Sequence, residues 1–213
     1  MNEEIKIDGL LGRCGDREVF IGFAPASTLT KYSFPDVLDE TTGEGYQRRF
    51  SAEHSLEFKR YIYSRGATSN PLTFNLRQSR ASDWRIAVTG NSCQRHAALY
   101  MRHDAEPLMA QVDGQHRLGF LQDSPIEFSF MAFLGLSVEE EMEIFRTING
   151  KAKGLSSSLL DFTEARSLGH DLPIVKPELF VALRLNEDPH SPWYQKLDLG
   201  GEKTVGMKRV ASV

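Results

Sequence analysis

The sequence has 213 residues, 40% of them apolar and 25% charged, so it can bury a core and is not expected to be disordered overall. Its 25 basic and 29 acidic residues give a net charge of −4, which argues against a protein that coats nucleic acid by charge alone. Two cysteines, Cys14 and Cys93, are too few for a disulfide scaffold or a zinc site with four cysteines. We expect a cytoplasmic protein without a membrane partner. The N-terminus has no apolar signal segment, and the most apolar stretch, 128–136, is too short to cross a membrane.

Alternating apolar and polar residues indicate several β-strands. They are expected at residues 18–24, 71–76, 84–88, 96–101, 108–112 and 126–134. We interpret the second and third as one hairpin and the fourth and fifth as another, because short polar segments separate them. The acidic, glycine-containing segment 35–45 predicts an exposed loop.

Helix signals alternate with these strands. Ser51 is a good N-cap for a helix that ends near Gly66. Ser137 and Glu140 match a capping box, and the apolar stripe of that helix is expected to be Val138, Met142, Phe145 and Ile148. Two later helices are expected, one capped by Ser156 and one from Pro177 to about Asn186. The sequence therefore predicts a mixed α+β fold, with a loop-like region from residue 187 and a short β-like tail at 208–213.

The segment Gln111–Gly119 is the most informative part of the chain for chemistry. A strand runs into a glycine turn and then a helix, an arrangement whose free N–H groups bind anions. Gly114 would let the backbone approach a ligand, and Arg117 would donate two hydrogen bonds to phosphate oxygens. His116 would hydrogen-bond a phosphate or transfer a proton. Asp113 would cap the helix or hold a metal or a water. The alternative is that Asp113 is only an N-cap and that Gln115 to Arg117 lie on a solvated face.

Two further clusters have similar chemistry. Gln47 and Arg48 stand at the entrance of the Ser51 helix, where a solvated helix start is the alternative. Residues 147–156 carry Lys151, Lys153 and two glycines between two helices, and they would close over a phosphate. The alternative for this third cluster is a surface connection whose lysines complement a helix dipole.

Taken together, the three clusters resemble the DGQHR-domain family. Asp113–Arg117 matches the family's name-giving motif in full, and Gly45–Arg48 is similar to its Gly-Tyr-Gln-Arg element. Phe145–Asn149, followed by Lys153, Leu155 and Ser156, is similar to its Phe-x-x-Ile-Asn and Lys-x-Leu-Ser segment. Ser191–Tyr194 also resembles a late family feature. The resemblance runs from about residue 18 to about 200, so we expect a DGQHR domain over 1–200 and a tail over 201–213.

This resemblance implies a fold similar to the nucleotide-binding domain of ParB proteins and sulfiredoxin, with a mixed sheet and C-terminal helices. Members of the family include the B components of bacterial systems that insert phosphorothioate or 7-deazaguanine into DNA. The first kind is linked to transcriptional control and the second to nucleotide hydrolysis, and nothing in the motifs separates them. Because family members are usually longer, we expect a further C-terminal element after the tail.

The leading hypothesis is a protein that binds ATP or another NTP with Mg²⁺, and hydrolyses it, for a bacterial DNA-modification system. The resemblance implies a nucleotide site made of Gln47, Arg48, Gly114, Gln115, His116, Arg117, Asn149 and Lys153. Asp113, His116 and Arg117 would be catalytic, with Asp113 also the metal ligand. Other proteins of the system, and DNA, are the expected partners.

Two rival hypotheses come from other functional classes. The first is a DNA-binding transcriptional regulator without catalysis, whose phosphate contacts would be Arg48, Arg49, Arg117, Lys151 and Lys153. The net charge of −4 and the lack of a readable helix-turn-helix disfavour it. The second is a scaffold that assembles modification enzymes and keeps a vestigial nucleotide site.

Overall fold

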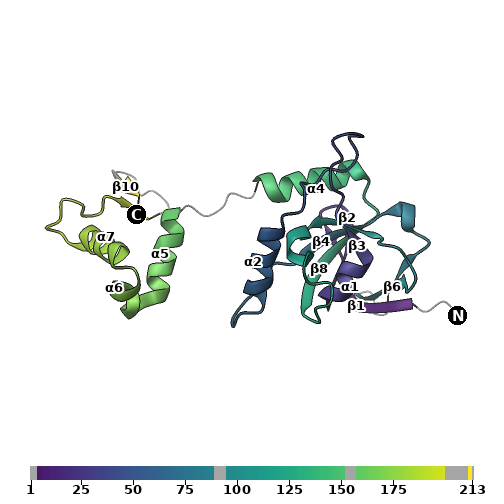
Figure 1. Ribbon diagram of the computed structural model, residues 1–213, viewed down its shortest axis with the longest axis horizontal. Helices are drawn as coiled ribbons and strands as arrows, with labels where there is room; N and C mark the ends of the chain where they lie inside the picture. The colour runs from purple at the N-terminus through teal and green to yellow at the C-terminus, as the bar shows by residue number, and fades with distance from the viewer. Residues whose placement is uncertain (1–3, 89–94, 152–156, 200–210, 213) are drawn as a thin grey trace. The chain divides into compact units, whose positions relative to one another are not determined.

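The computed structural model describes residues 4–88, 95–151, 157–199 and 211–212. The chain divides into two compact units, Met1–Lys151 and Ala152–Val213 (Figure 1). The elements confirm the predicted mixed α+β class. The extent of a family domain over 1–200 stays a prediction, and Cys93 lies outside the described residues.

The first unit contains most of the chain's regular structure. Its strands are β1 (Glu4–Cys14), β2 (Arg17–Pro25), β3 (Ser33–Phe34), β4 (Leu72–Leu76), β5 (Trp84–Val88), β6 (His96–Arg102), β7 (Met109–Asp113) and β8 (Glu127–Leu134). Its helices are α1 (Ala26–Tyr32), α2 (Ala52–Ile62), the 3₁₀ turn η1 (Gln78–Arg80), α3 (Gln115–Leu118) and α4 (Val138–Lys151). All six predicted strand positions are confirmed within a few residues, whereas β1, β3, α1 and η1 were not predicted.

The eight strands form one mixed sheet in the order β3-β7-β4-β8-β2-β1-β6-β5. Strand β4 runs antiparallel to β7 and parallel to β8, while β5 and β6 pair with each other. Both predicted hairpins are therefore wrong, because β4 does not pair with β5 and β6 does not pair with β7. The physical reason is burial. All five residues of β4 are buried, which suits the middle of a sheet covered on both faces, whereas the half-exposed β5 lies at an edge.

Each face of the sheet has its own hydrophobic cluster. On one face, Phe20 and Phe130 pack against α1, with their ring centroids 5.9 Å apart. On the other face, Val19 and Phe133 pack against Ile144 of α4. Burying an aromatic or aliphatic side chain contributes roughly 1.5–3 kcal/mol, so these contacts fix α1 and α4 on opposite faces of the sheet.

Two of the three predicted helix caps are present in the described residues, but the predicted stripe of α4 is only partly right. Ser51 accepts a hydrogen bond from the His54 N–H at 3.4 Å, and Ser137 and Glu140 form a reciprocal capping box. Val138 and Met142 are each 39% exposed, contrary to the prediction. The buried side of α4 instead includes the fully buried Glu141, so the helix is rotated from its expected phase by a polar contact.

The second unit is small and mainly helical. Its elements are α5 (Ser157–Leu168), the 3₁₀ turn η2 (Gly169–Asp171), α6 (Leu172–Val175), α7 (Pro177–Glu187) and the parallel strand pair β9 (Leu197–Asp198) and β10 (Ala211–Ser212). Its buried cluster is Ala165, Leu172 and Leu179. The predicted Pro177 helix is confirmed, while the predicted Ser156 cap lies outside the described residues. Among the helices that the structure describes, none is both long enough and apolar enough to cross a membrane.

Candidate functional site

The turn between β7 and α3 carries the Asp113–Arg117 motif. Gly114 has a φ of 124°, a conformation that favours glycine, and a Cβ on it would lie 2.6 Å from Cδ2 of Leu72. The predicted helix follows at once, but it is only the four residues Gln115–Leu118. One turn of helix has a small dipole. Anion binding at this turn would therefore depend on side chains more than on the helix end.

The three predicted clusters line one pocket of the first unit. Its volume is about 190 Å³, and it lies where the β7–α3 turn meets the segment before α2 and the C-terminal half of α4. The lining residues are Gln47, Arg48, Val112, Asp113, Gly114, Gln115, His116, Arg117, Phe145 and Asn149. Seven of the eight residues predicted to bind a nucleotide are in this set. The eighth, Lys153, lies outside the described residues.

Gln47 joins the segment before α2 to the sheet. Its side-chain Nε2 donates a hydrogen bond to the backbone carbonyl of Gln111, and Val37 forms a parallel bridge with Gln47. This bond fixes the orientation of the amide, so the remaining atom, Oε1, is an acceptor. Oε1 is buried and has no partner within the described part of the chain. The Gln47 side chain thus attaches the segment before α2 to β7. Its remaining atom is a hydrogen-bond acceptor, whereas an anion would need a donor.

His116 presents a hydrogen-bond donor. Its Nδ1 accepts a hydrogen bond from the Ser51 N–H at 3.3 Å, so the neutral imidazole carries its proton on Nε2. That Nε2 is buried and makes no hydrogen bond to any described residue. Burial lowers the pKa of His116, and the charges of Arg48 and His54 lower it further. His116 is therefore neutral at physiological pH and offers an N–H group.

Two more side chains of the pocket offer donors. Nε2 of Gln115 is buried without a partner in the described ranges. Arg48 is exposed and forms no ion pair with a described carboxylate. By contrast, Nδ2 of Asn149 donates to the Phe145 carbonyl at 2.9 Å within α4. The unpartnered donors of the described lining residues are therefore the exposed Arg48 guanidinium and the Nε2 atoms of Gln115 and His116, which are buried and would contact an anion only after a small side-chain movement. Asn149 would contribute its amide only after a change of rotamer.

Arg117 is already engaged by its neighbours. Its guanidinium pairs with the Asp113 carboxylate and donates to the Asn70 carbonyl at 2.6 Å and to Ser69 Oγ at 3.1 Å. The side chains of this pair are 19% and 32% exposed, so an anion that reaches Arg117 would compete with Asp113 for a partly buried guanidinium. Asp113 is the one carboxylate among the lining residues. No cluster of three or more possible metal ligands occurs in the described residues, so the pocket has no cage for a resident metal.

A buried polar network behind the pocket was missed by the sequence analysis. Its centre is Glu141, which is fully buried in the first turn of α4. The carboxylate accepts hydrogen bonds from Asn75 at 2.6 Å, from Arg77 Nε at 2.8 Å and Nη2 at 2.6 Å, and from the Tyr46 hydroxyl at 3.3 Å. Arg77 also pairs with Asp36. One carboxylate thus connects β4, the segment before α2, and α4.

This network fixes the spacing between two pocket walls. Tyr46 precedes Gln47 and Arg48 on one wall, and its ring packs edge-on against Phe145 on the other, with centroids 5.3 Å apart. Burial raises the pKa of the Tyr46 phenol, and the charge of Glu141 raises it further, so the hydroxyl stays protonated as a donor. The only sequence signal for Glu141 is its helical phase, four residues before Phe145.

Comparison with known proteins gives no family for this chain. The sequence matches no protein-family model and no curated protein.

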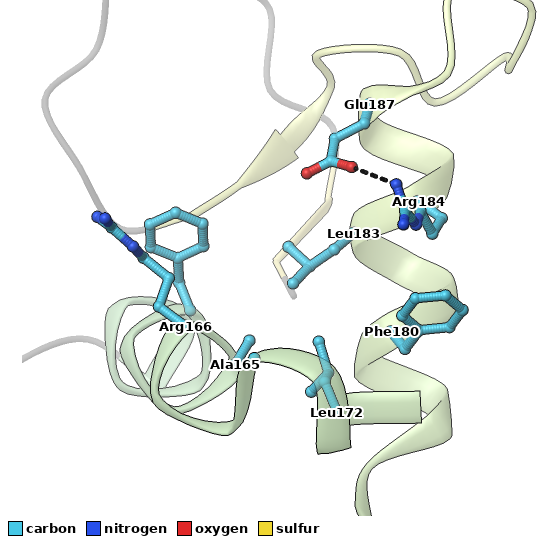
Figure 2. Close-up of a pocket in the computed structure, with 9 residues that line it drawn as sticks. Ala165, Arg166, Leu172, Phe180, Leu183, Arg184 and Glu187 are labelled. Carbon is cyan, nitrogen blue, oxygen red and sulfur yellow. Dashed lines mark hydrogen bonds and ion pairs between the residues drawn. The ribbon is translucent and has the colours of Figure 1, made fainter. Parts of the chain in front are cut away.

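The second unit has a hollow of a different character. Figure 2 shows this space of about 380 Å³ between the helices α5, α6 and α7, with apolar side chains such as Leu172, Phe180 and Leu183 around it. At its rim Arg184 pairs with Glu187 at 3.3 Å, and Arg166 comes from α5. None of the lining residues belongs to the predicted site, and their chemistry is mainly apolar.

Proposed function

We propose that the protein binds a nucleotide by its phosphates in the pocket at the β7–α3 turn and hydrolyses it. The observation that carries the proposal is the convergence of three separate segments, around residues 47, 115 and 149, on one pocket of about 190 Å³. The pocket offers buried donors at Gln115 and His116 and an exposed arginine, Arg48. Donors and cations without protein partners are the groups that a phosphate satisfies.

The roles follow from the contacts. Arg48 and the Nε2–H of His116 bind phosphate oxygens, and Gly114 lets the backbone approach them. Arg117 turns from Asp113 to the phosphates when they enter, which frees the Asp113 carboxylate. Asp113 then orients a water molecule and accepts its proton as the new P–O bond forms and the bond to the leaving phosphate breaks.

Asp113 would be the protein ligand of a magnesium ion bound to the nucleotide. Mg²⁺ is usually held by one or two carboxylates together with substrate phosphates, and the single carboxylate of Asp113 fits that role. The ion would supply charge neutralisation for the phosphates. The protein's own contribution is the placement of donors around them.

The cellular role is proposed from the motif resemblance. It is support for a bacterial DNA-modification system, either 7-deazaguanine insertion or phosphorothioation, together with the system's other proteins. The structure leaves the DNA-binding alternative open. Arg49 pairs with Glu40 and Arg117 pairs with Asp113, but an anion can compete for either arginine, and Arg48 is unpaired among the cations whose side chains are described. The observation against this alternative is the net charge of −4.

The test is phosphate release from ATP, CTP and GTP with Mg²⁺. We expect turnover with at least one nucleotide, and its loss in His116→Ala and in Arg117→Ala. Matched controls are His103→Ala and Arg65→Ala, because these side chains are exposed and do not line the pocket. Turnover that is unchanged in both pocket variants would refute the assignment. A gel-shift titration across salt concentrations tests the regulator: tight specific DNA binding without nucleotide would favour it.

A further inference from the structure

An exposed aromatic ring lies beside the pocket. Phe50 is 42% exposed, and its neighbours in the sequence, Gln47 to Arg49 and Ser51, are polar. Its ring centroid is 5.7 Å from that of His116, a pocket-lining residue, and 5.6 Å from that of Phe120. Phe50 stands two residues after Arg48, which also lines the pocket. An exposed phenyl ring thus borders the place where the proposed function puts the phosphates.

The position of this ring is fixed by its neighbours. Gly119 lies against it, since a Cβ on Gly119 would overlap the Phe50 ring and come 2.6 Å from Ser55 Oγ. Ser51, the next residue, caps α2 and donates its N–H to His116. The Phe50 ring is therefore fixed in one position although it is exposed. A fixed ring loses little conformational entropy when a ligand covers it.

The size of the pocket separates the phosphates from the rest of a nucleotide. Pockets that enclose a whole small-molecule ligand usually have about 300–1,000 Å³. A pocket of about 190 Å³ accommodates phosphate groups and leaves the nucleoside outside. The base must then rest on the surface next to the pocket, one ribose away from the phosphates.

We propose that Phe50 is the stacking platform for the nucleobase. This inference rests on the proposed phosphate site and adds a second subsite to it. Every nucleobase has a π-face, so stacking on a phenyl ring selects little among bases. ATP, CTP and GTP are therefore expected to bind with similar affinity, and each more tightly than tripolyphosphate, which has no base.

The test compares the magnesium complexes of ATP and tripolyphosphate by calorimetry on the full chain. Variants are Phe50→Leu, which keeps an apolar side chain but removes the ring, and Phe50→Trp, which restores a ring. Base stacking on an aromatic residue corresponds to roughly a 5- to 100-fold change in affinity. We expect Phe50→Leu to weaken ATP binding by at least about fivefold, to leave tripolyphosphate binding unchanged, and Phe50→Trp to recover ATP binding. Phe23→Leu is the control, because Phe23 is an exposed phenylalanine of β2 that does not line the pocket.

The outcomes separate the two proposals. If tripolyphosphate binds but Phe50→Leu does not weaken ATP binding, the base platform is refuted and the phosphate site stands. If Phe50→Leu weakens ATP and tripolyphosphate equally, Phe50 only supports His116, and the platform is again refuted. If the folded wild-type protein binds neither ligand, the phosphate site and the platform built on it both fail.

Discussion

The ion pair between Arg77 and Glu141 is expected to couple the stability of the sheet to the position of α4. Arg77→Met would leave the Glu141 carboxylate buried with only Asn75 and Tyr46 as donors. Removing one partner of a buried pair costs about 3–5 kcal/mol. Since the Arg77 side chain is 20% exposed and two donors remain, the lower end of that range applies, about 3 kcal/mol. Glu141→Leu is expected to cost a similar amount, because Arg77 keeps only Asp36 as its carboxylate partner.

The measurement is a double-mutant cycle by urea unfolding, followed by circular dichroism. The double variant Arg77→Met with Glu141→Leu should be more stable than the sum of the single losses predicts, by about 2 kcal/mol. Glu143→Gln is the matched control on α4, because this side chain is exposed, and it should change stability by less than about 0.5 kcal/mol. Additive single losses, or a loss under about 1 kcal/mol for Arg77→Met, would refute the coupling.

Three further predictions concern the pocket itself. Gly114→Ala should destabilise the fold by about 1–3 kcal/mol because φ is 124°, whereas Gly12→Ala, with nothing within 4 Å of the new Cβ, should not; urea unfolding compares them. Since burial lowers the pKa of His116 in the folded protein, this imidazole is protonated at a higher pH in the unfolded chain than in the folded one. The free energy of unfolding should therefore fall as pH drops below about 6.5, and His116→Asn should lessen its difference between pH 7.5 and pH 5.5, measured by urea unfolding. An equal difference in the wild-type protein and the variant would contradict this prediction. Asp113→Asn should release Arg117, tighten the binding of magnesium-free tripolyphosphate at least about twofold by calorimetry and abolish hydrolysis of magnesium nucleotides; weaker binding of magnesium-free tripolyphosphate would contradict the proposed exchange.

The positions of the strands follow from the sequence, but their partners do not. Alternation marks each strand locally, so β4, β5, β6, β7 and β8 were predicted within a few residues. Thr73 and Asn75 are the polar positions in the alternation of β4. Asn75 is in fact fully buried, because its amide exchanges hydrogen bonds of 3.0 Å with the backbone of Leu136. The pairing of β4 with β7 and β8, and the bond from Asn75 to Leu136, are long-range contacts that no local pattern records.

The residues of the site could be predicted better than their roles. Asp113 to Arg117 are contiguous on one turn, so their grouping is local. The convergence of Gln47 and Asn149 on that turn depended on the motif resemblance. The role of Gln47 could not be read from its position, because only its bond to the Gln111 carbonyl shows that its donor is used. Glu141 was missed because a glutamate in an acidic first turn is usually solvated, and its donors come from two distant segments.

The most direct test of the central claim is calorimetric binding of magnesium ATP and magnesium tripolyphosphate to the full chain and to Arg48→Gln. Among the described residues that line the pocket, Arg48 is the cation without an ion pair, and charge-assisted hydrogen bonds contribute about 1.5–3 kcal/mol. The proposed site predicts that both ligands bind the wild-type protein at one site per chain, and that Arg48→Gln weakens both by roughly tenfold or more. A folded protein that binds neither ligand, or that binds both equally well without Arg48, would contradict it.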